Sequence, residues 1–135
     1  MKTIIEEWKG AKYHRDTGVI EDWSHMMEVS NLGNVRYTEE YRSTSRVIKD
    51  RPLVRKSGNK HANYQHIAFS SNGKPILRRI HRMVLSSFCP LPIDNEDKMD
   101  ADHIDFNHTN NELSNLQWLE RSEHMKRKSS TCELV

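Results

Sequence analysis

Apolar residues recur on both sides of two turn-forming clusters in the first half of the chain. One cluster, Ser-Asn-Leu-Gly-Asn at residues 30–34, lies between two valines. The other, Ser-Asn-Gly at 71–73, separates the apolar-rich stretches 64–69 and 74–80. Asn and Gly tolerate the positive φ that tight hairpins need. The first half is therefore predicted to form a small antiparallel β unit.

The pattern changes in the second half of the chain. In IHRMVLSSF, residues 80–88, apolar residues recur at helical spacing, and two prolines follow that would end a helix. Residues 99–104 and 116–119 can form short strands around a polar loop at 105–112. A serine that can cap a helix precedes residues 123–128, which are predicted to be helical. The whole pattern predicts an α+β protein.

Length and composition limit the class of protein. With 135 residues, 30% charged and 7% aromatic, we expect two interdependent units, 1–79 and 80–128, and a flexible tail at 129–135. No apolar run approaches the roughly 18 residues that cross a membrane, and the start is too short and acidic for a secretory signal. Cys89 and Cys132 form no CxxC pair, which favours free thiols and a cytoplasmic location.

Charge is distributed unevenly behind a net value of +2. Residues 42–92 contain eleven Lys or Arg and one acid, whereas residues 93–105 contain six acids and one Lys. A basic segment of this kind is typical of proteins that bind a phosphate backbone, although a solvated surface is the alternative. The predicted DNA contacts are Arg42, Arg46, Lys49, Arg51, Arg55, Lys56, Lys60, Arg78, Arg79 and Arg82.

The densest set of reactive side chains lies in DHIDFNHTNNELSNLQWLERSEH, residues 102–124. Asp102 directly precedes His103, Asn115 follows twelve residues after that histidine, and His124 nine residues later. Carboxylate and imidazole groups can hold a hard divalent cation with positions left for water and phosphate. Histidine also suits the deprotonation of water near neutral pH. The segment predicts a metal-assisted hydrolytic site; an unrelated polar surface loop is the alternative.

This segment resembles the HNH (His-Asn-His) endonuclease motif, in the form found in phage and intron-encoded nucleases. The resemblance implies a ββα-metal unit of two short antiparallel strands, a loop and a helix. It implies that His103 is the general base, that Asn115 orients it, and that Asp102 and His124 bind one Mg²⁺, for which Mn²⁺ or another divalent ion can substitute. Relatives usually carry Gly where this chain has Phe106, so a turn with positive φ would be strained here.

Two further segments resemble elements that accompany this motif. EEWK at 6–9 and EVSNLGNVR at 28–36 are similar to a nuclease-associated modular DNA-binding element, with an insertion at 13–25 between them. The helix predicted at 80–88 is similar to one that precedes the motif in the same family. Within it, His81 is expected to be structural or to contact phosphate, rather than to bind metal.

Together, the motif and the basic segment favour a metal-dependent DNA endonuclease that hydrolyses phosphodiester bonds. His108, in the motif loop, is expected to reach the substrate. DNA is the expected partner, no membrane contact is expected, and a homodimer is left open. A phage-encoded protein that acts in the host cell fits the resemblance. The alternatives are a catalytically silent DNA-binding module of the same fold and, with less support, a protein that acts on RNA.

Overall fold

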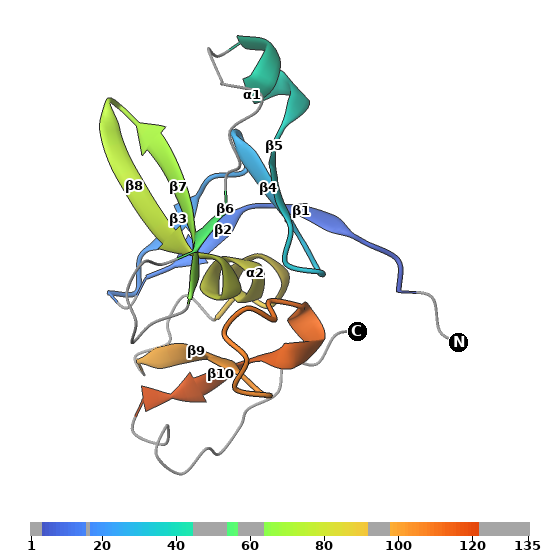
Figure 1. Cartoon of the computed structure of the whole chain (residues 1–135). Helices are drawn as coiled ribbons and strands as arrows, with labels where there is room; N and C mark the ends of the chain where they lie inside the picture. The colour runs from blue at the N-terminus through green and yellow to red at the C-terminus, as the bar shows by residue number, and fades with distance from the viewer. Residues whose placement is uncertain (1–3, 16, 45–53, 57–63, 92–97, 122–135) are drawn as a thin grey trace.

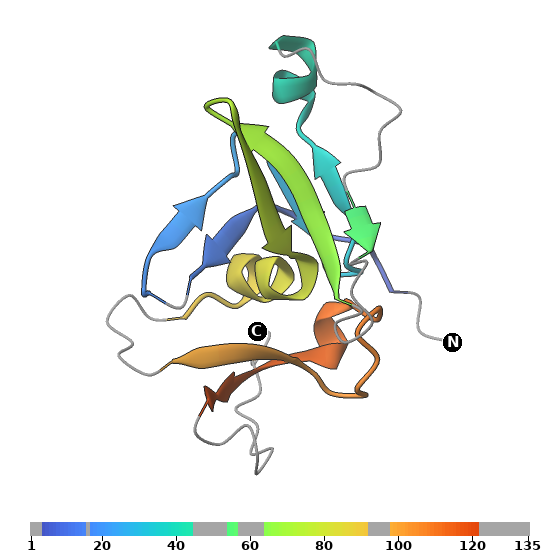
Figure 2. The ribbon, with the colours of Figure 1, turned by 60° about the vertical axis from the view of Figure 1, so that its left-hand side comes forward.

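The computed structural model describes residues 4–15, 17–44, 54–56, 64–91 and 98–121. Within these ranges, four small antiparallel sheets and two helices are present. The N-terminal sheets and a C-terminal two-stranded ribbon lie on opposite sides of one central helix, as both ribbon views show (Figures 1 and 2). The predicted α+β class agrees with this mixture of small sheets and few helices.

The first three-stranded sheet contains the hairpin predicted around residues 30–34. Its strands are β1 (Trp8–Gly10), β4 (Met27–Ser30) and β5 (Val35–Tyr37), in the order β1-β4-β5. The turn between β4 and β5 places Gly33 at φ +84°, where a residue with a Cβ is strained. This part of the prediction is confirmed.

Two elements in the N-terminal half were not predicted. The segment interpreted as an insertion forms a hairpin of β2 (Lys12–His14) and β3 (Ile20–Asp22). A short helix, α1 (Glu39–Thr44), follows β5. Elements this short contain fewer than two periods of a hydrophobic pattern, so periodicity could not reveal them.

The second three-stranded sheet has the order β6-β7-β8, with β6 (Val54–Lys56), β7 (Gln65–Ser71) and β8 (Lys74–Arg79). Asn72 and Gly73 connect β7 to β8 with φ of 52° and 74°. Two consecutive positive φ values define the two-residue turn that Asn-Gly favours. The second predicted hairpin is therefore confirmed.

Helix α2 (Ile80–Phe88) coincides with the predicted helix. The ribbon consists of β9 (Met99–His103) and β10 (Leu116–Glu120), which pair antiparallel, and the short 3-10 turn η1 (Leu113–Asn115) leads into β10. Both strands lie within one residue of their predicted limits. The predicted motif helix at 123–128 and the tail lie outside the described residues.

One hydrophobic core joins the N-terminal and C-terminal halves. Ile80, Met83, Val84 and Leu85 of α2 are fully buried and belong to the same cluster as residues of β4, β7 and β10. Burial of each such side chain contributes about 1.5–3 kcal/mol. The hydrophobic core therefore continues across the predicted boundary at residues 79–80.

A buried arginine connects α2 to two strands. Nε of Arg82 donates to the main-chain oxygen of His14 (2.6 Å), and Nη1 donates to that of Met99 (2.9 Å). Arg82 is only 9% exposed. These bonds correct the prediction of a DNA contact for Arg82: its guanidinium satisfies main-chain oxygens of β2 and β9 inside the protein.

A second arginine predicted to contact DNA is already paired. Nε and Nη2 of Arg78 on β8 each lie 2.7 Å from an oxygen of Glu21 on β3. Both side chains are largely buried, at 21% and 14% exposure. Because a bidentate pair neutralises the guanidinium locally, Arg78 is corrected to a residue that fastens β8 to the β2–β3 hairpin.

The Glu21→Gln substitution should lower stability in a pH-dependent way. The hydrogen bond from Arg78 holds the pKa of Glu21 below its usual value. The stabilisation is therefore fully present above the unfolded-state pKa and is lost as pH falls through the folded-state pKa. We expect the variant to lose about 1–2 kcal/mol at neutral pH, measured by urea unfolding. The difference from wild type should shrink at about pH 3; an equal difference at both pH values would contradict this assignment.

Two expectations drawn from composition can be compared with the structure. Among the described residues, no helix is long and apolar enough to span a membrane. Cys89 is disulfide-bonded, so the expectation of a free thiol is wrong at this position. The one other cysteine of the sequence, Cys132, lies outside the described residues.

Candidate functional site

The predicted general base, His103, lies at the end of β9 and is held by an asparagine from the following loop. Its Nε2 is 2.8 Å from Oδ1 of Asn111, and Nδ2 of Asn111 donates to Oε1 of Gln65 on β7 (2.7 Å). Because Oδ1 can only accept, Nε2 carries the proton. In the neutral ring, Nδ1 is then the basic atom.

Asn115, which was expected to orient this base, has a different set of hydrogen bonds. Its Nδ2 donates to Oδ1 of Asp105 (2.8 Å) and to the main-chain oxygen of Asn110 (2.9 Å), while its Oδ1 accepts from the Asp105 N–H (3.1 Å). Asn115 therefore closes the loop between β9 and η1. The bond to His103 comes from Asn111 instead, which corrects the predicted role of Asn115.

The loop between β9 and η1 is held together by hydrogen bonds of its Asp and Asn side chains. Asp105 accepts from the Asn107 N–H (2.8 Å) and from Nδ2 of Asn110 (3.0 Å), and Asn107 accepts from the Thr109 N–H (3.1 Å). The hydrogen bonds from Asn110 and Asn107 lower the pKa of the Asp105 carboxyl. These local bonds replace a regular ladder and fix the backbone on either side of Asn111.

Phe106 in this loop has φ +63° and a side chain that is 70% exposed. The concern about positive φ at this position is confirmed. An L-residue in this region costs about 1–2 kcal/mol, whereas glycine loses about 0.5–1 kcal/mol more conformational entropy on folding. We therefore expect Phe106→Gly to raise the free energy of unfolding by up to about 1 kcal/mol. Phe106→Ala, which keeps the Cβ, should show no such gain in the same urea titration, and equal stabilities would contradict the strain.

Three aromatic side chains from separate segments, Tyr64, His81 and His108, lie around the base. Tyr64 stacks with His108 (4.2 Å between ring centroids) and with His81 of α2 (5.1 Å). His81 also stacks with His103, at 4.6 Å. The rings of His81 and Tyr64 together cover His103, which is only 3% exposed. Tyr64 was missed from the sequence because it lies 39 positions from His103 and carries no motif signal.

Burial sets the protonation of the two inner histidines. Burial lowers the pKa of His81 well below its usual value, and its Nε2 lies 3.1 Å from the main-chain oxygen of Ala101. Burial also lowers the pKa of His103, although the hydrogen bond to Asn111 opposes this shift. Both rings are therefore neutral near neutral pH, the form in which an imidazole can accept a proton.

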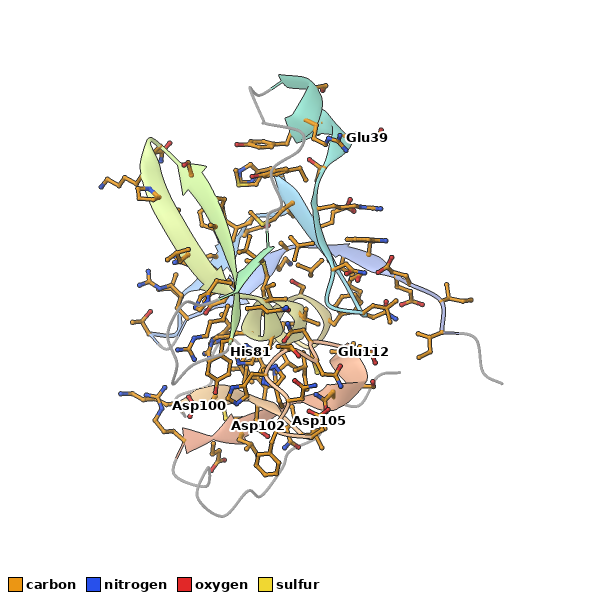
Figure 3. The ribbon with its side chains drawn as sticks, viewed as in Figure 1. Glu39, His81, Asp100, Asp102, Asp105 and Glu112 are labelled. Atoms are coloured by element: carbon orange, nitrogen blue, oxygen red, sulfur yellow. The ribbon has the colours of Figure 1, made fainter. Side chains whose placement is uncertain are left out.

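Asp102, the predicted metal ligand, precedes His103 on β9. Side chains alternate along a strand, so Asp102 shares a face with Asp100, opposite to His103. Its Oδ2 accepts from Nε2 of Gln117, its partner on β10 (2.9 Å). Figure 3 shows Asp100 and Asp102 near β9, with His81 of α2 above them. A strand-end carboxylate has the oxygen chemistry that Mg²⁺ prefers.

The second predicted metal ligand, His124, lies outside the described residues. Among the described residues, no group of three or more His, Cys, Asp or Glu is placed to hold a metal. Asp102 therefore fits a hard divalent cation by its donor chemistry, and any site built on it needs further ligands from water, phosphate or the residues that follow β10.

The predicted DNA contacts are only partly within the described residues. Arg42 is exposed on α1, Arg79 is exposed at the end of β8, and Arg55 and Lys56 belong to β6. Arg78 and Arg82 are engaged inside the protein. The remaining members lie outside the described residues: Arg46, Lys49, Arg51 and Lys60.

The N-terminal β unit contacts the loop that carries Asn111. The main-chain oxygen of Asn31 accepts from the Leu113 N–H (2.8 Å). A Cβ on Gly33 would lie 2.8 Å from both the Cβ and the main-chain oxygen of Asn111. The turn between β4 and β5 thus supports the loop that orients His103.

No family model and no curated protein sequence matches the chain. Among solved structures, the chain is similar to the HNH homing endonuclease I-HmuI, in a structure that describes DNA binding and cleavage by that enzyme. The two share 25% sequence identity with a TM-score of 0.59, over 89% of this chain and 56% of the other. The chain thus spans little more than half the length of that neighbour. Both the architecture and this comparison give the chain an HNH-like α+β fold.

Proposed function

We propose that this chain is a metal-dependent DNA endonuclease of the HNH type, which hydrolyses phosphodiester bonds with one divalent ion. The observation that carries the proposal is the arrangement of His103. This neutral imidazole is held through Nε2 by Asn111 at the end of β9, one residue after Asp102, whose carboxylate lies on the other face of the strand. The similarity to a DNA-cleaving neighbour supports the same assignment.

In this proposal, Nδ1 of His103 takes the proton of the attacking water. Asn111 keeps the other ring nitrogen protonated, and the ring of His81 limits rotation of the base by stacking. A Mg²⁺ or Mn²⁺ ion held by Asp102 and His124 would supply positive charge to the phosphate and the leaving oxygen. Because His103 is 3% exposed, its aromatic cover must open to admit the phosphate.

The partner in this proposal is DNA, contacted by the exposed members of the basic segment. Phosphate contacts of this kind position a protein without reading sequence. A homing role is proposed by similarity to the neighbour, while phage origin and cytoplasmic location stay predictions. Nothing in the described residues supports a homodimer.

A catalytically silent DNA-binding module is the second candidate. The burial of His103 favours it, since a base that water cannot reach does not hydrolyse DNA. The ring tautomer of His103, fixed by Asn111, favours the enzyme, because DNA binding alone does not require it.

Supercoiled plasmid DNA distinguishes the two candidates. Protein stripped of metal with EDTA is mixed with the plasmid, and Mg²⁺ or Mn²⁺ is then added. We expect nicked or linear DNA only after the metal is added, because the bound ion would stabilise the charge that develops on the phosphate during cleavage. DNA binding without cleavage at any metal concentration would support the silent module, and cleavage in EDTA would contradict metal dependence.

A further inference from the structure

An open cavity of about 620 Å³ lies where the β2–β3 hairpin, β8, the start of α2 and the β9–β10 ribbon meet. Five arginines contribute to its lining: Arg15, Arg78, Arg79, Arg82 and Arg121. We call this cavity the arginine pocket. Part of its lining comes from the β2–β3 hairpin, a segment that was interpreted from the sequence only as an insertion. No sequence motif therefore indicated the pocket.

The arginine pocket has an excess of positive charge. Glu21 neutralises Arg78, and Asp100 pairs with Arg121 at 2.9 Å. Arg82 is bonded to main-chain oxygens, which carry no net charge. Five guanidinium groups thus face two carboxylates, which leaves an excess of three positive charges. A concave surface of one sign concentrates the field and attracts anions.

Arg79 and Arg15 have the freedom to bind an anion. The guanidinium of Arg79 lies over the Tyr64 ring, 4.6 Å from its centroid. A guanidinium over an aromatic face can still use its N–H groups to bind an anion. The Arg15 side chain is 51% exposed and lies 3.9 Å from Glu21, at the outer limit of an ion pair. Arg121 is 46% exposed at the edge of the pocket and is paired there with Asp100.

The arginine pocket adjoins the candidate base. Tyr64 and His81 contribute to its lining, and both rings stack with His103, at centroid distances of 5.9 and 4.6 Å. An anion in the pocket would therefore be separated from His103 by about the width of one ring. Such an anion would be too far from His103 to be the scissile phosphate. It would be close enough to be another phosphate of the same DNA strand.

We propose that the arginine pocket binds a backbone phosphate of the DNA substrate, near the scissile phosphate. This inference rests on the proposed function and adds the group that fixes the strand against the base. Arg79 and Arg15 contact the phosphate with support from Arg121, while Arg78 and Arg82 hold the pocket walls. The chemical class recognised is a phosphodiester or phosphate dianion.

The variant that tests the proposal is the double change Arg15→Gln and Arg79→Gln, which affects exposed side chains. The matched control is Arg36→Gln, which is compared with the single variant Arg79→Gln. Arg36 also lies over an aromatic ring, 3.8 Å from Trp8, and is 51% exposed. Each single change removes one positive charge from a stacked guanidinium.

The first measurement is the affinity for duplex DNA at several salt concentrations. Loss of one phosphate contact should reduce the slope of log K against log salt by about 0.9. We expect this reduction and about tenfold weaker binding for the double variant, and a wild-type slope for Arg36→Gln. An unchanged slope in the double variant would overturn the proposal.

The second measurement uses inorganic phosphate and no DNA. The arginine Nε–H signals of the full chain are followed by NMR as phosphate replaces chloride at constant ionic strength. We expect the signals of Arg79 and Arg15 to shift, and that of Arg36 to stay. No shift would overturn the proposal, and so would a shift combined with an unchanged DNA slope, which would mean that the pocket takes free anions alone. Phosphate binding together with the reduced DNA slope, in a protein that fails to cleave DNA, would contradict the proposed nuclease and leave the pocket established.

Discussion

His103→Ala should lower the rate of DNA cleavage by about 10²–10⁴ while leaving the affinity for DNA close to that of wild type. That range is the usual contribution of a general base, and His103 is the neutral imidazole that Asn111 holds in place. DNA affinity should change little because the buried ring offers no surface to the phosphate backbone. Cleavage is followed on supercoiled plasmid with Mg²⁺, and binding by fluorescence anisotropy.

His25→Ala provides the control for this experiment. His25 is exposed and lies beside Trp23, with its ring 6.3 Å from the indole. Its removal should leave both cleavage and binding unchanged. If His103→Ala cut DNA as fast as wild type, the assigned base would be wrong, and an equal loss in both variants would point to a general effect on the protein.

Gly33→Ala should damage both stability and activity, although residue 33 belongs to the N-terminal turn. The φ of +84° costs a residue with a Cβ about 1–2 kcal/mol. The new Cβ would also lie 2.8 Å from the Cβ of Asn111, a distance that forces the loop to move. Overpacking of this kind costs about 1–3 kcal/mol more. Because Asn111 holds His103, the same movement should reduce the cleavage rate.

Gly73→Ala separates the two effects. Gly73 has φ +74°, and a Cβ there would meet nothing within 4 Å. This variant should lose only the strain energy and should retain wild-type cleavage. Urea unfolding and plasmid cleavage of both variants provide the comparison. Equal losses of stability with full activity in Gly33→Ala would show that the N-terminal turn does not support the loop.

The parts of the fold that the sequence predicted are those with strong local signals. Asn72-Gly73 between apolar stretches defined one hairpin, and IHRMVLSSF defined α2 to the residue. Phe106 was recognised as a strained position from one departure in a motif, and its φ of +63° agrees. In each case a few neighbouring residues decide the conformation, so tertiary contacts are not needed to infer it.

The parts that the sequence could not predict depend on contacts between distant residues. Asn111 and Asn115 are chemically identical, and only the folded loop shows which of them meets His103. Arg78 and Arg82 looked like phosphate contacts because the sequence did not reveal Glu21 or the carbonyls that satisfy them. The sequence of a basic segment gives its net charge. It does not show which of its cations are already bonded to groups inside the protein.

The central claim, that His103 acts as the base in hydrolysis of DNA, is tested most directly by chemical rescue. His103→Gly removes the imidazole and leaves space beneath the rings of Tyr64 and His81. We predict that this variant is inactive with Mg²⁺ alone and that added imidazole restores plasmid cleavage in proportion to its concentration, without accelerating the wild type. Cleavage by His103→Gly at the wild-type rate in the absence of imidazole would contradict the account.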